Sequence, residues 1–597
     1  MRRRRSACRR RALETVEKVV TGIWPIRDFW LSSVASGKDS RILCELPLRS
    51  AAVSPRLLLR RLWHLASENR LFSWVLLAGA LLRLDAMLGY PGALWFSGDS
   101  YIYVGAALRP VPDLSKVTGY SFFLRLLLPF HSFTLVTGVQ HAMGLLIAVM
   151  IYVLLRRNRV SKTWAAVATL PQLLDGYIIE DEHMIMAETV FTFLLMIATL
   201  LLLWKPRTAW WTALVAGLLV GAAAMVRTEG EAMLAVLPLW LLLRGWSWKT
   251  LRGWAVAVIF AVGMLVPVGA YVGWFHDETG HFDTTLSEGF SLWGRVSSFA
   301  DCAVIKPTGD EATVCPTQPI ADRTPPGDYI WHAPYVHADM DSICTATVTD
   351  GKASKTCGPV SPAGDKVLTK FAEDAVLAQP LDYVKTVVKD VLLSFGFPRI
   401  AYPTSGTTYY YSFHFNYVGT DPATGKPISL LPPKNVAKIP PLVVPQNSVY
   451  NDWLNYGHQA PGVVRKVFAA PIAVYQRVVF TWGPLLAVIF LVGLGGWFSV
   501  TARRRGTGMR SLLSAETLGS LRVRWRPRGT SMLPWWTAVA LLVAPIAVAD
   551  FDYRYLIPVI PFAAMAAGLA FAPRKDADQD TPSQSKAEVE SAVLRGN

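Results

Sequence analysis

The stretch FTLVTGVQHAMGLLIAVMIYVLL, residues 133–155, decides the class of fold. It contains no Asp, Glu, Lys or Arg, and a helix of about 20 such residues spans the hydrocarbon core of a bilayer. The basic sequence RRNRVSK follows directly at 156–162. Because Lys and Arg accumulate in the cytoplasmic loops of membrane proteins, the two segments together predict a membrane-spanning helix that ends on the cytoplasmic side.

The composition of the whole chain points the same way. Hydrophobic residues make up 52% of the 597 positions and charged residues only 17%, whereas soluble domains carry roughly 25% charged residues. A net charge of +16 would suit nucleic acid, but in a membrane protein it reflects basic cytoplasmic loops. We therefore expect membrane lipids, and no nucleic acid, among the partners.

Further apolar runs of similar character recur along the chain. Together with the first run they predict an all-α polytopic membrane protein with about ten transmembrane helices. The run at 163–179 is interrupted by Pro171, and the run at 230–244 is short. The further runs lie at 71–90, 163–179, 184–204, 209–226, 230–244, 254–274, 478–499, 532–549 and 555–572.

The basic clusters between these runs set the predicted orientation. With the N-terminus inside, KPR at 205–207, RGWSWKTLR at 244–252 and the stretch 501–528 all fall on the cytoplasmic side. We therefore predict a multi-pass plasma-membrane protein with both termini cytoplasmic. The predicted parts are a basic cytoplasmic extension at 1–69, a membrane core at 70–275, an extracytoplasmic domain at 276–477, further membrane helices at 478–574 with a basic loop at 500–531, and a disordered tail at 575–597.

The long segment 276–477 contains four cysteines, Cys302, Cys315, Cys344 and Cys357. Outside the cytoplasm they predict two disulfides with three possible pairings, and free buried thiols are the alternative. This extracytoplasmic domain is expected to be mixed α/β or irregular. Within it, 366–396 has apolar residues at three- and four-residue spacing and predicts two amphipathic helices broken near Pro380.

Acidic and basic side chains gather in the segments that should face outward. LWFSGDSYIYVG, at 94–105, places Asp99 beside Tyr101 and Tyr103, and Tyr120 follows in GYSFFLRLL. The candidate groups elsewhere are Glu180, Asp181, Glu182 and His183 in one turn, Arg227 in another, and Arg554 with Tyr555 ahead of the last run. Charge at a membrane boundary is costly to place and tends to be functional.

Each of these groups also has a structural interpretation. Asp99 could cap a helix, the acids at 180–182 could complement a helix dipole, and Arg227 and Arg554 could anchor the chain at the interface. His183 with nearby carboxylates could ligate Mg²⁺ or Mn²⁺, although no firm metal-ligand spacing is present. No Walker sequence, GxSxG or HExxH occurs, so the outer face should not use a nucleotide directly.

The order of these motifs resembles the polyprenyl-phosphate-dependent glycosyltransferases of the GT-C superfamily. That group includes protein O-mannosyltransferases, the aminoarabinose transferase and actinobacterial cell-wall glycosyltransferases. The resemblance covers roughly 71–275 and 478–572. It rests on SGDSYIYVG, GYSFFLRL, EDEH with AETVFTFLL, GLLVGAAAMVRTEG and DYRYLIPVIP. Many members carry a paired acid in the first loop, whereas here Ser100 follows Asp99, which leaves open whether Asp99 acts with an acid from 180–182.

The resemblance implies inverting transfer of a sugar from a polyprenyl-phosphate donor to an acceptor hydroxyl on a glycan, lipid or protein. Asp99 would be the general base, and Arg554, Arg227 and Tyr555 would hold the donor phosphate. Aromatic side chains at Tyr101, Tyr103 and Tyr120 would contact substrate.

Two other classes of function remain open from the sequence. A transporter or flippase of a lipid-linked sugar would read the same headgroup, and a non-catalytic scaffold or receptor would use the disulfide-bonded domain. Polar groups at one boundary and the lack of an internal repeat favour the enzyme over the transporter. The chain has no Asn-x-Ser/Thr sequon, which agrees with a bacterial source.

Overall fold

In the computed structural model, most of the described residues are helical. Residues Asn69–Asn597 form one compact unit, distinct from Met1–Glu68. The predicted extension at 1–69 and the predicted tail at 575–597 lie almost entirely outside the described residues. The structure describes residues 66–96, 99–332, 344–349, 352–357, 360–420, 425, 427–432, 449–460, 462–501, 522–525 and 530–573.

Four helical segments among the described residues are long and apolar enough to cross a membrane. A fifth results if α24 (Lys466–Val478) and α25 (Gly483–Gly495), which meet at 61°, form one broken span. These helices agree with the prediction of a helical membrane protein. The four segments are α4 (Arg70–Gly89), α7 (Phe133–Arg157), α14 (Leu251–Thr279) and Tyr553–Ala570, which joins the 3-10 turn η6 (Tyr553–Tyr555) to α28 (Leu556–Ala570).

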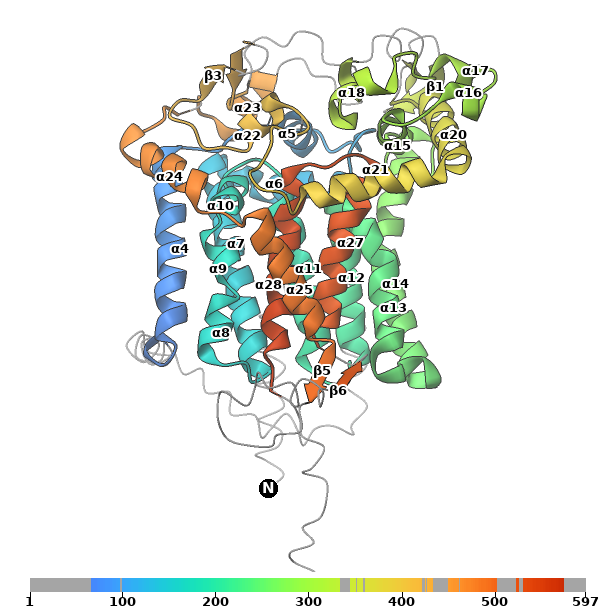
Figure 1. The fold of residues 1–597 in the computed structure, drawn as a ribbon. Coiled ribbons are helices and arrows are strands. Elements are labelled where there is room, and N and C mark those ends of the chain that lie inside the picture. The colour runs from blue at the N-terminus through green and yellow to red at the C-terminus, as the bar shows by residue number, and fades with distance from the viewer. Residues whose placement is uncertain are drawn as a thin grey trace, which may run out of the picture. The chain divides into compact units, whose positions relative to one another are not determined.

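Shorter apolar helices lie beside these segments (Figure 1). Each coincides with an apolar run of the sequence, but their length alone does not make them spans, so the count of about ten stays a prediction. They are α11 (Glu188–Trp204), α12 (Trp210–Val226), α13 (Ala232–Leu243) and α27 (Met532–Val548).

The run predicted at 163–179 is not one helix. It is divided among α8 (Lys162–Val167), α9 (Leu170–Leu174) and α10 (Gly176–Glu182). Pro171 stands in the first turn of α9, where its missing N–H costs least. Asp175 then caps α10, because its side chain accepts hydrogen bonds from the backbone N–H groups of Tyr177 and Ile178.

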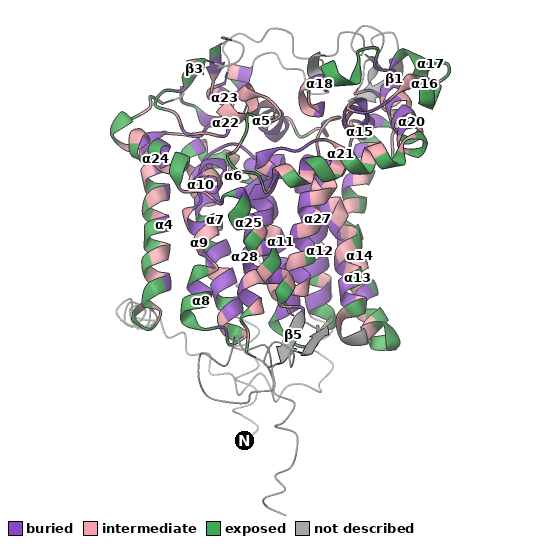
Figure 2. Ribbon diagram, viewed as in Figure 1, coloured by how far each residue is buried: buried purple, intermediate pink, exposed green. Residues whose placement is uncertain are grey.

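Burial differs strongly between the first and last long helices (Figure 2). In the segment Tyr553–Ala570, which contains α28, 83% of the residues are buried, against 22% of an equally long stretch of α4. The large side chains that α4 exposes recur at three- and four-residue spacing; they are Leu71, Trp74, Leu77, Leu81 and Leu84. A stripe of this kind is stable when its surroundings are apolar, as lipid is. Helix α28 is instead enclosed by protein, so the residues at its start reach the interior.

Close packing of α12 and α14 depends on small residues. A Cβ atom at Gly217 or Gly221 of α12 would overlap the backbone carbonyls of Phe260 or Met264 in α14. Glycine at such positions lets two helix backbones approach, which is the common way of packing helices within a membrane.

The two ends of the helical bundle differ in their side chains. One end, called the site end here, carries Asp99, His183 and Asp552 and the short helices α5 (Ser100–Leu108) and α6 (Gly119–Leu127). The opposite, basic end carries arginines that close helix C-termini. There Arg157 Nε donates to the Trp204 carbonyl at 2.7 Å, and Arg244 donates to Leu202 at 2.8 Å. Cations at helix C-termini complement the helix dipole.

The segment 276–477 lies mostly at the site end (Figure 1). The two helices expected within 366–396 are confirmed as α20 (Pro362–Ala378) and α21 (Pro380–Leu393), with Pro380 in the first turn of the second. Other elements of this segment are α15 (Glu288–Ser297), α16 (Cys302–Ile305), α17 (Asp310–Thr313), η4 (Ile320–Asp322), α18 (Pro326–His332), α22 (Ser405–Tyr410), α23 (Val449–Gly457) and the antiparallel pairs β1 (Cys344–Thr349) with β2 (Lys352–Cys357) and β3 (Val418–Thr420) with β4 (Pro427–Ser429). At the basic end, β5 (Phe498–Thr501) pairs with β6 (Arg522–Trp525).

One of the two expected disulfides is present among the described residues and joins Cys302 to Cys315. The backbone register of β1 and β2 pairs Cys344 with Cys357 directly across the antiparallel ladder. Cα atoms of such partners lie about 4.5–5.5 Å apart, which is within the range that a disulfide bridges. A second disulfide between these two cysteines therefore remains a prediction.

Candidate functional site

Asp99 lies at the N-cap of α5, yet its carboxylate does not cap the helix. Instead it forms two ion pairs. Arg554 Nη1 donates to Asp99 Oδ2 at 2.6 Å, and Lys116 Nζ lies 3.0 Å from Asp99 Oδ1. The helix-capping interpretation of Asp99 is therefore wrong for its side chain, because both carboxylate oxygens are directed at cations.

Burial and charge act in opposite directions on this carboxylate. Asp99 is only 6% exposed, and burial by itself raises the pKa of a carboxyl. Lys116 and Arg554 outweigh burial and hold the pKa of Asp99 well below its usual range. The side chain is therefore an ionised carboxylate at neutral pH.

Arg554 reaches Asp99 from the η6 turn at the start of α28. The turn is fixed by Asp552, whose side chain accepts the backbone N–H of Arg554 at 3.1 Å and lies 3.3 Å from Arg554 Nε. Tyr411 in turn donates its hydroxyl to Asp552 Oδ2 at 3.2 Å. Asp99, Lys116, Asp552 and Arg554 are called the Asp99 centre below.

Arg227 forms a second group beside the Asp99 centre. It follows the last residue of α12, is buried, and pairs with Glu188 in the first turn of α11 and with Glu229, whose Oε2 lies 2.9 Å from Arg227 Nε. The Tyr555 ring lies 5.5 Å from the Arg554 guanidinium and 6.0 Å from that of Arg227. Tyr555 thus lies close to both arginines.

A small cavity opens beside Arg227. Its lining combines this arginine and Glu229 with the Tyr555 ring and apolar side chains. The lining residues are Phe191, Arg227, Glu229, Leu541, Pro545, Tyr555 and Pro558.

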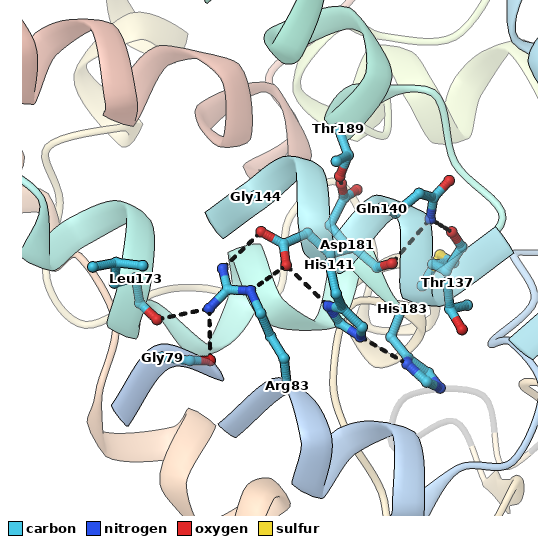
Figure 3. A network of polar contacts seen from close by, with 12 residues as sticks. Gly79, Arg83, Thr137, Gln140, His141, Gly144, Leu173, Asp181, His183 and Thr189 are labelled. Carbon is cyan, nitrogen blue, oxygen red and sulfur yellow. Dashed lines mark hydrogen bonds and ion pairs between the residues drawn. The ribbon is translucent and has the colours of Figure 1, made fainter. Parts of the chain in front are cut away.

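The predicted second acidic site divides into two parts. Glu182 and His183 belong to a buried network, called the Arg83 network here, with Arg83 of α4 and His141 of α7 (Figure 3). Arg83 binds the Glu182 carboxylate with two nitrogens, at 2.7 and 2.8 Å. His141 Nδ1 lies 2.9 Å from Glu182 Oε2, and His141 Nε2 lies 3.0 Å from His183 Nδ1. All of these groups are occupied with one another.

Glu180 and Asp181 are buried outside this network. Asp181 Oδ2 accepts a hydrogen bond from Thr189 at 3.3 Å, so this carboxyl faces α11. Burial, followed by the charge of Glu188, raises the pKa of Asp181. Burial, then Asp181 and Glu188, raises the pKa of Glu180. Asp181 therefore lies toward α11 and the charges of Glu188 and Arg227, which both affect its pKa.

The two predicted acidic segments are nevertheless tied together through their backbones. Leu94 donates its N–H to the His183 carbonyl at 3.0 Å and accepts the N–H of Ile185 at 3.1 Å. Ser100, next to Asp99, donates its hydroxyl to the Ile185 carbonyl at 3.0 Å. The Arg83 network therefore supports the backbone at 183–185, which pairs with Leu94 and holds Ser100 beside Asp99, and its role here is positional.

The predicted tyrosines differ in their surroundings. Tyr103 is buried, and Asp99 and Glu188 are among the charges that raise its pKa, after burial itself. Tyr120 is also buried and donates its hydroxyl to Gln140 Oε1 at 2.6 Å, so it supports the bundle. Tyr101 packs partly buried against the main core. Of the three, Tyr103 is the one whose pKa is affected by the charges of Asp99 and Arg554.

Lys116 and Asp552 were missed as site residues by the sequence interpretation. Lys116 is the only lysine in 91–132, a segment predicted to lie outside, where lysine is less frequent than in cytoplasmic loops. That departure from the charge rule was the available signal. Asp552 stands two residues before Arg554, but sequence alone does not show that its carboxylate turns back onto the turn that carries Arg554.

A Mg²⁺ or Mn²⁺ ion would need several oxygen or nitrogen ligands that converge on one point. Within the described part of the chain, no three His, Cys, Asp or Glu side chains converge as metal ligands. Asp99 and Glu182 both face cationic or imidazole groups instead. The expectation of Mg²⁺ or Mn²⁺ stays a prediction from sequence.

The geometry is thus a buried carboxylate held between an arginine and a lysine, at one end of a bundle of apolar helices. Comparisons with protein-family models, with curated proteins and with solved structures find no match to this chain.

Proposed function

We propose that the protein is an integral membrane glycosyltransferase that moves a sugar from a polyprenyl-phosphate donor to an acceptor hydroxyl at the site end. One observation carries the proposal: Asp99 contacts both Arg554 and Lys116 in a buried position at the end of apolar helices. A carboxylate and paired cations are the groups that this transfer needs. The resemblance to GT-C glycosyltransferases supports the same reaction.

Asp99 acts as the general base in this proposal. The acceptor oxygen attacks the anomeric carbon and forms the new C–O bond, while its proton passes to the Asp99 carboxylate. The bond between the anomeric carbon and the donor phosphate oxygen breaks, and its electron pair leaves with polyprenyl phosphate. Arg554 and Lys116 stabilise the charge that grows on that phosphate, since an arginine fork matches phosphate oxygens. Attack opposite the leaving group inverts the anomeric configuration.

The ion pairs of Asp99 also suggest how the base is switched on. A carboxylate between two cations is a weak base, because its pKa is held low. A donor phosphate competes for the same cations, since it carries the same sign of charge. When the phosphate takes over Arg554 and Lys116, the pKa of Asp99 rises and the carboxylate becomes able to accept a proton.

The contacts rank the two candidate phosphate ligands. Arg227 is bound by two carboxylates, Glu188 and Glu229, so a phosphate would have to displace both. Arg554 shares its charge between Asp99 and Asp552, and Asp99 is the group that must be released for catalysis. Arg554 with Lys116 is therefore the proposed donor-phosphate site, and Arg227 with Tyr555 forms its wall.

The test is sugar transfer by purified protein in lipid, using a panel of polyprenyl-phosphate sugars. We expect Asp99→Asn to bind donor but to release polyprenyl phosphate about 10²- to 10⁴-fold more slowly than the unmodified protein. Asp382→Asn, on the surface of α21, is the control and should retain full activity.

Other outcomes assign the protein to a different class. Donor binding without release by the unmodified protein, across several acceptors, would contradict transfer and indicate transport of the lipid-linked sugar. Absence of donor binding would indicate a scaffold or receptor.

A further inference from the structure

Arg399 occupies an aromatic cage that the proposed reaction does not use. Its guanidinium carbon lies 3.8 Å from the Tyr177 ring centre, 4.5 Å from that of Tyr553 and 5.1 Å from that of Phe480. The three rings come from α10, from η6 and from the link between α24 and α25. Such contacts hold a guanidinium in a fixed orientation and favour its positive charge.

The charge of Arg399 is not neutralised within the described part of the chain. The carboxylates that pair with arginine there bind Arg83, Arg109, Arg227, Arg295 and Arg554. Arg399 is half-buried, so part of the residue is accessible to a ligand. A planar, pre-oriented guanidinium without a carboxylate partner suits a phosphate group, which it can bind with two hydrogen bonds.

The surroundings of Arg399 are apolar and exposed. Phe397 is 63% exposed, Ile400 48% and Trp482 44%, and the Phe397 and Trp482 rings lie 5.6 Å apart. Trp482 is the N-cap of α25, at the junction of the bent candidate span. Arg399 thus stands at the end of a membrane-type helix, with uncovered apolar side chains around it.

The amphipathic helix α21 and the uniformly apolar helix α25 meet at this point. A Cβ atom at Gly483, the first residue of α25, would overlap the backbone of Phe395 and Gly396 just after α21. Helix α21 exposes an apolar stripe that continues toward Arg399. The stripe consists of Leu381, Val384, Val388 and Leu392. Apolar faces of this kind are stable against the acyl region of a bilayer.

The cage is also linked to the Asp99 centre. The backbone N–H of Ile400 donates to the Tyr553 hydroxyl at 3.1 Å, and the Tyr553 ring is one wall of the cage. The next residue along the chain is Arg554, which contacts Asp99. The cage around Arg399 and the proposed donor-phosphate site at Arg554 therefore share the η6 turn, because Tyr553 and Arg554 are consecutive residues of it.

We infer that Arg399 binds the phosphate of a membrane lipid that approaches along the exposed apolar stripe of α21, before that phosphate reaches Arg554. The identification of this lipid as the polyprenyl-phosphate donor rests on the proposed function. Phe397, Ile400 and Trp482 contact the first isoprene units of its chain, while the Arg399 fork holds the phosphate oxygens.

The test measures binding of a polyprenyl monophosphate to the full-length protein in phosphatidylcholine nanodiscs. We expect Arg399→Gln to weaken binding about 10- to 100-fold, the effect of losing a charge-assisted hydrogen-bonded pair. Arg399→Lys keeps the charge but not the planar fork and should be intermediate. Arg477→Gln is the matched control, because Arg477 of α24 is exposed and its guanidinium also lies over an aromatic ring, that of Phe415, at 5.6 Å.

The inference is overturned if Arg399→Gln elutes as a folded protein in size-exclusion chromatography and binds the lipid as tightly as the unmodified protein. If inorganic phosphate binds as tightly as the polyprenyl monophosphate, and Arg399→Gln loses this binding too, the ligand is free phosphate and the inference of a lipid is overturned. The proposed function is separated by a parallel transfer assay. If lipid binding depends on Arg399 but no sugar is transferred, the lipid site is supported and the glycosyltransferase is excluded. If sugar is transferred and Arg399→Gln has the same donor KM as the unmodified protein, the glycosyltransferase is supported and the lipid site is excluded.

Discussion

Hydrogen-bond direction determines how many protons the Arg83 network holds. His183 Nε2 lies 2.8 Å from the Tyr90 carbonyl, which can only accept, so this nitrogen carries hydrogen. Burial, together with His141, lowers the pKa of His183 to about 3, so the ring is neutral and its Nδ1 accepts from His141 Nε2. One further proton then lies between His141 Nδ1 and Glu182, because neither would otherwise donate in their 2.9 Å contact.

The network makes a stability prediction at the residue scale. Glu182→Leu leaves the Arg83 charge buried without its carboxylate, and we expect a loss of about 3–5 kcal/mol in stability. The double variant Arg83→Met with Glu182→Leu removes both charges and should recover most of that loss. Thermal unfolding in detergent measures both. A double variant as unstable as Glu182→Leu alone would show that the charge pair is not the cause.

Helix α27 ends where the long segment 276–477 folds back onto the bundle. Asp550, just after α27, accepts the Tyr402 hydroxyl at 2.8 Å and the Gly327 N–H at 2.7 Å. Tyr402 also lies 3.5 Å from Asp390 of α21, which pairs with Arg295 of α15 at 2.6 Å. The Asp550 carboxyl thus joins the end of α27 to α18 directly and to α21 through Tyr402 and Asp390.

The pKa of Asp550 gives this junction a pH dependence. Burial raises the pKa to about 7, above the unfolded value of about 3.9. The folded state therefore holds a proton that the unfolded state releases between about pH 4 and 7, and stability falls as pH rises through that window. We expect a slope of at most about 1.4 kcal/mol per pH unit.

Asp550→Asn isolates that contribution. Burial also raises the pKa of Glu288 to about 7, so some pH dependence should remain in the variant. We expect the melting temperature of the unmodified protein to fall more steeply between pH 5 and 7 than that of Asp550→Asn. Parallel curves for the two proteins would be inconsistent with the assignment.

At the scale of the whole molecule, the sequence predicted helices better than contacts. Apolar runs at 71–90, 133–155 and 532–549 coincide with α4, α7 and α27 within a few residues, because a long apolar run fixes helix length locally. The break at Pro171 was visible, but the capping role of Asp175 needed the fold.

The site shows the same limit. Asp99 and Arg554 were both identified as candidates, yet their contact joins residues 455 positions apart. Glu182 was assigned to a second acidic site with Glu180, Asp181 and His183, whereas its carboxylate binds Arg83. The helix faces on which these side chains lie, and hence their partners, depend on how the helices pack, which charge patterns along the sequence do not determine.

The orientation of the bundle is open to direct measurement. The basic end should face the cytoplasm and the site end should face outward. In a background with Cys8 and Cys44 replaced by serine, Asp277→Cys at the end of α14, where the side chain is 83% exposed, should react with a membrane-impermeant maleimide on intact cells. Lys205→Cys, exposed at the other end, should react only after permeabilisation. The reverse pattern would contradict the proposed sidedness.

The separation of Asp99 from Arg554 also has a consequence for biogenesis. A ribosome adding about 5–20 residues per second completes Arg554 roughly 20–90 seconds after Asp99, so the inserted chain holds its acid for that time without the arginine. Lys116, encoded in the same loop and 3.0 Å from the carboxylate, can neutralise Asp99 from the start. The contact between Asp99 and Arg554 is completed only when the last membrane segment arrives, so a chain truncated before Arg554 would lack the proposed donor site.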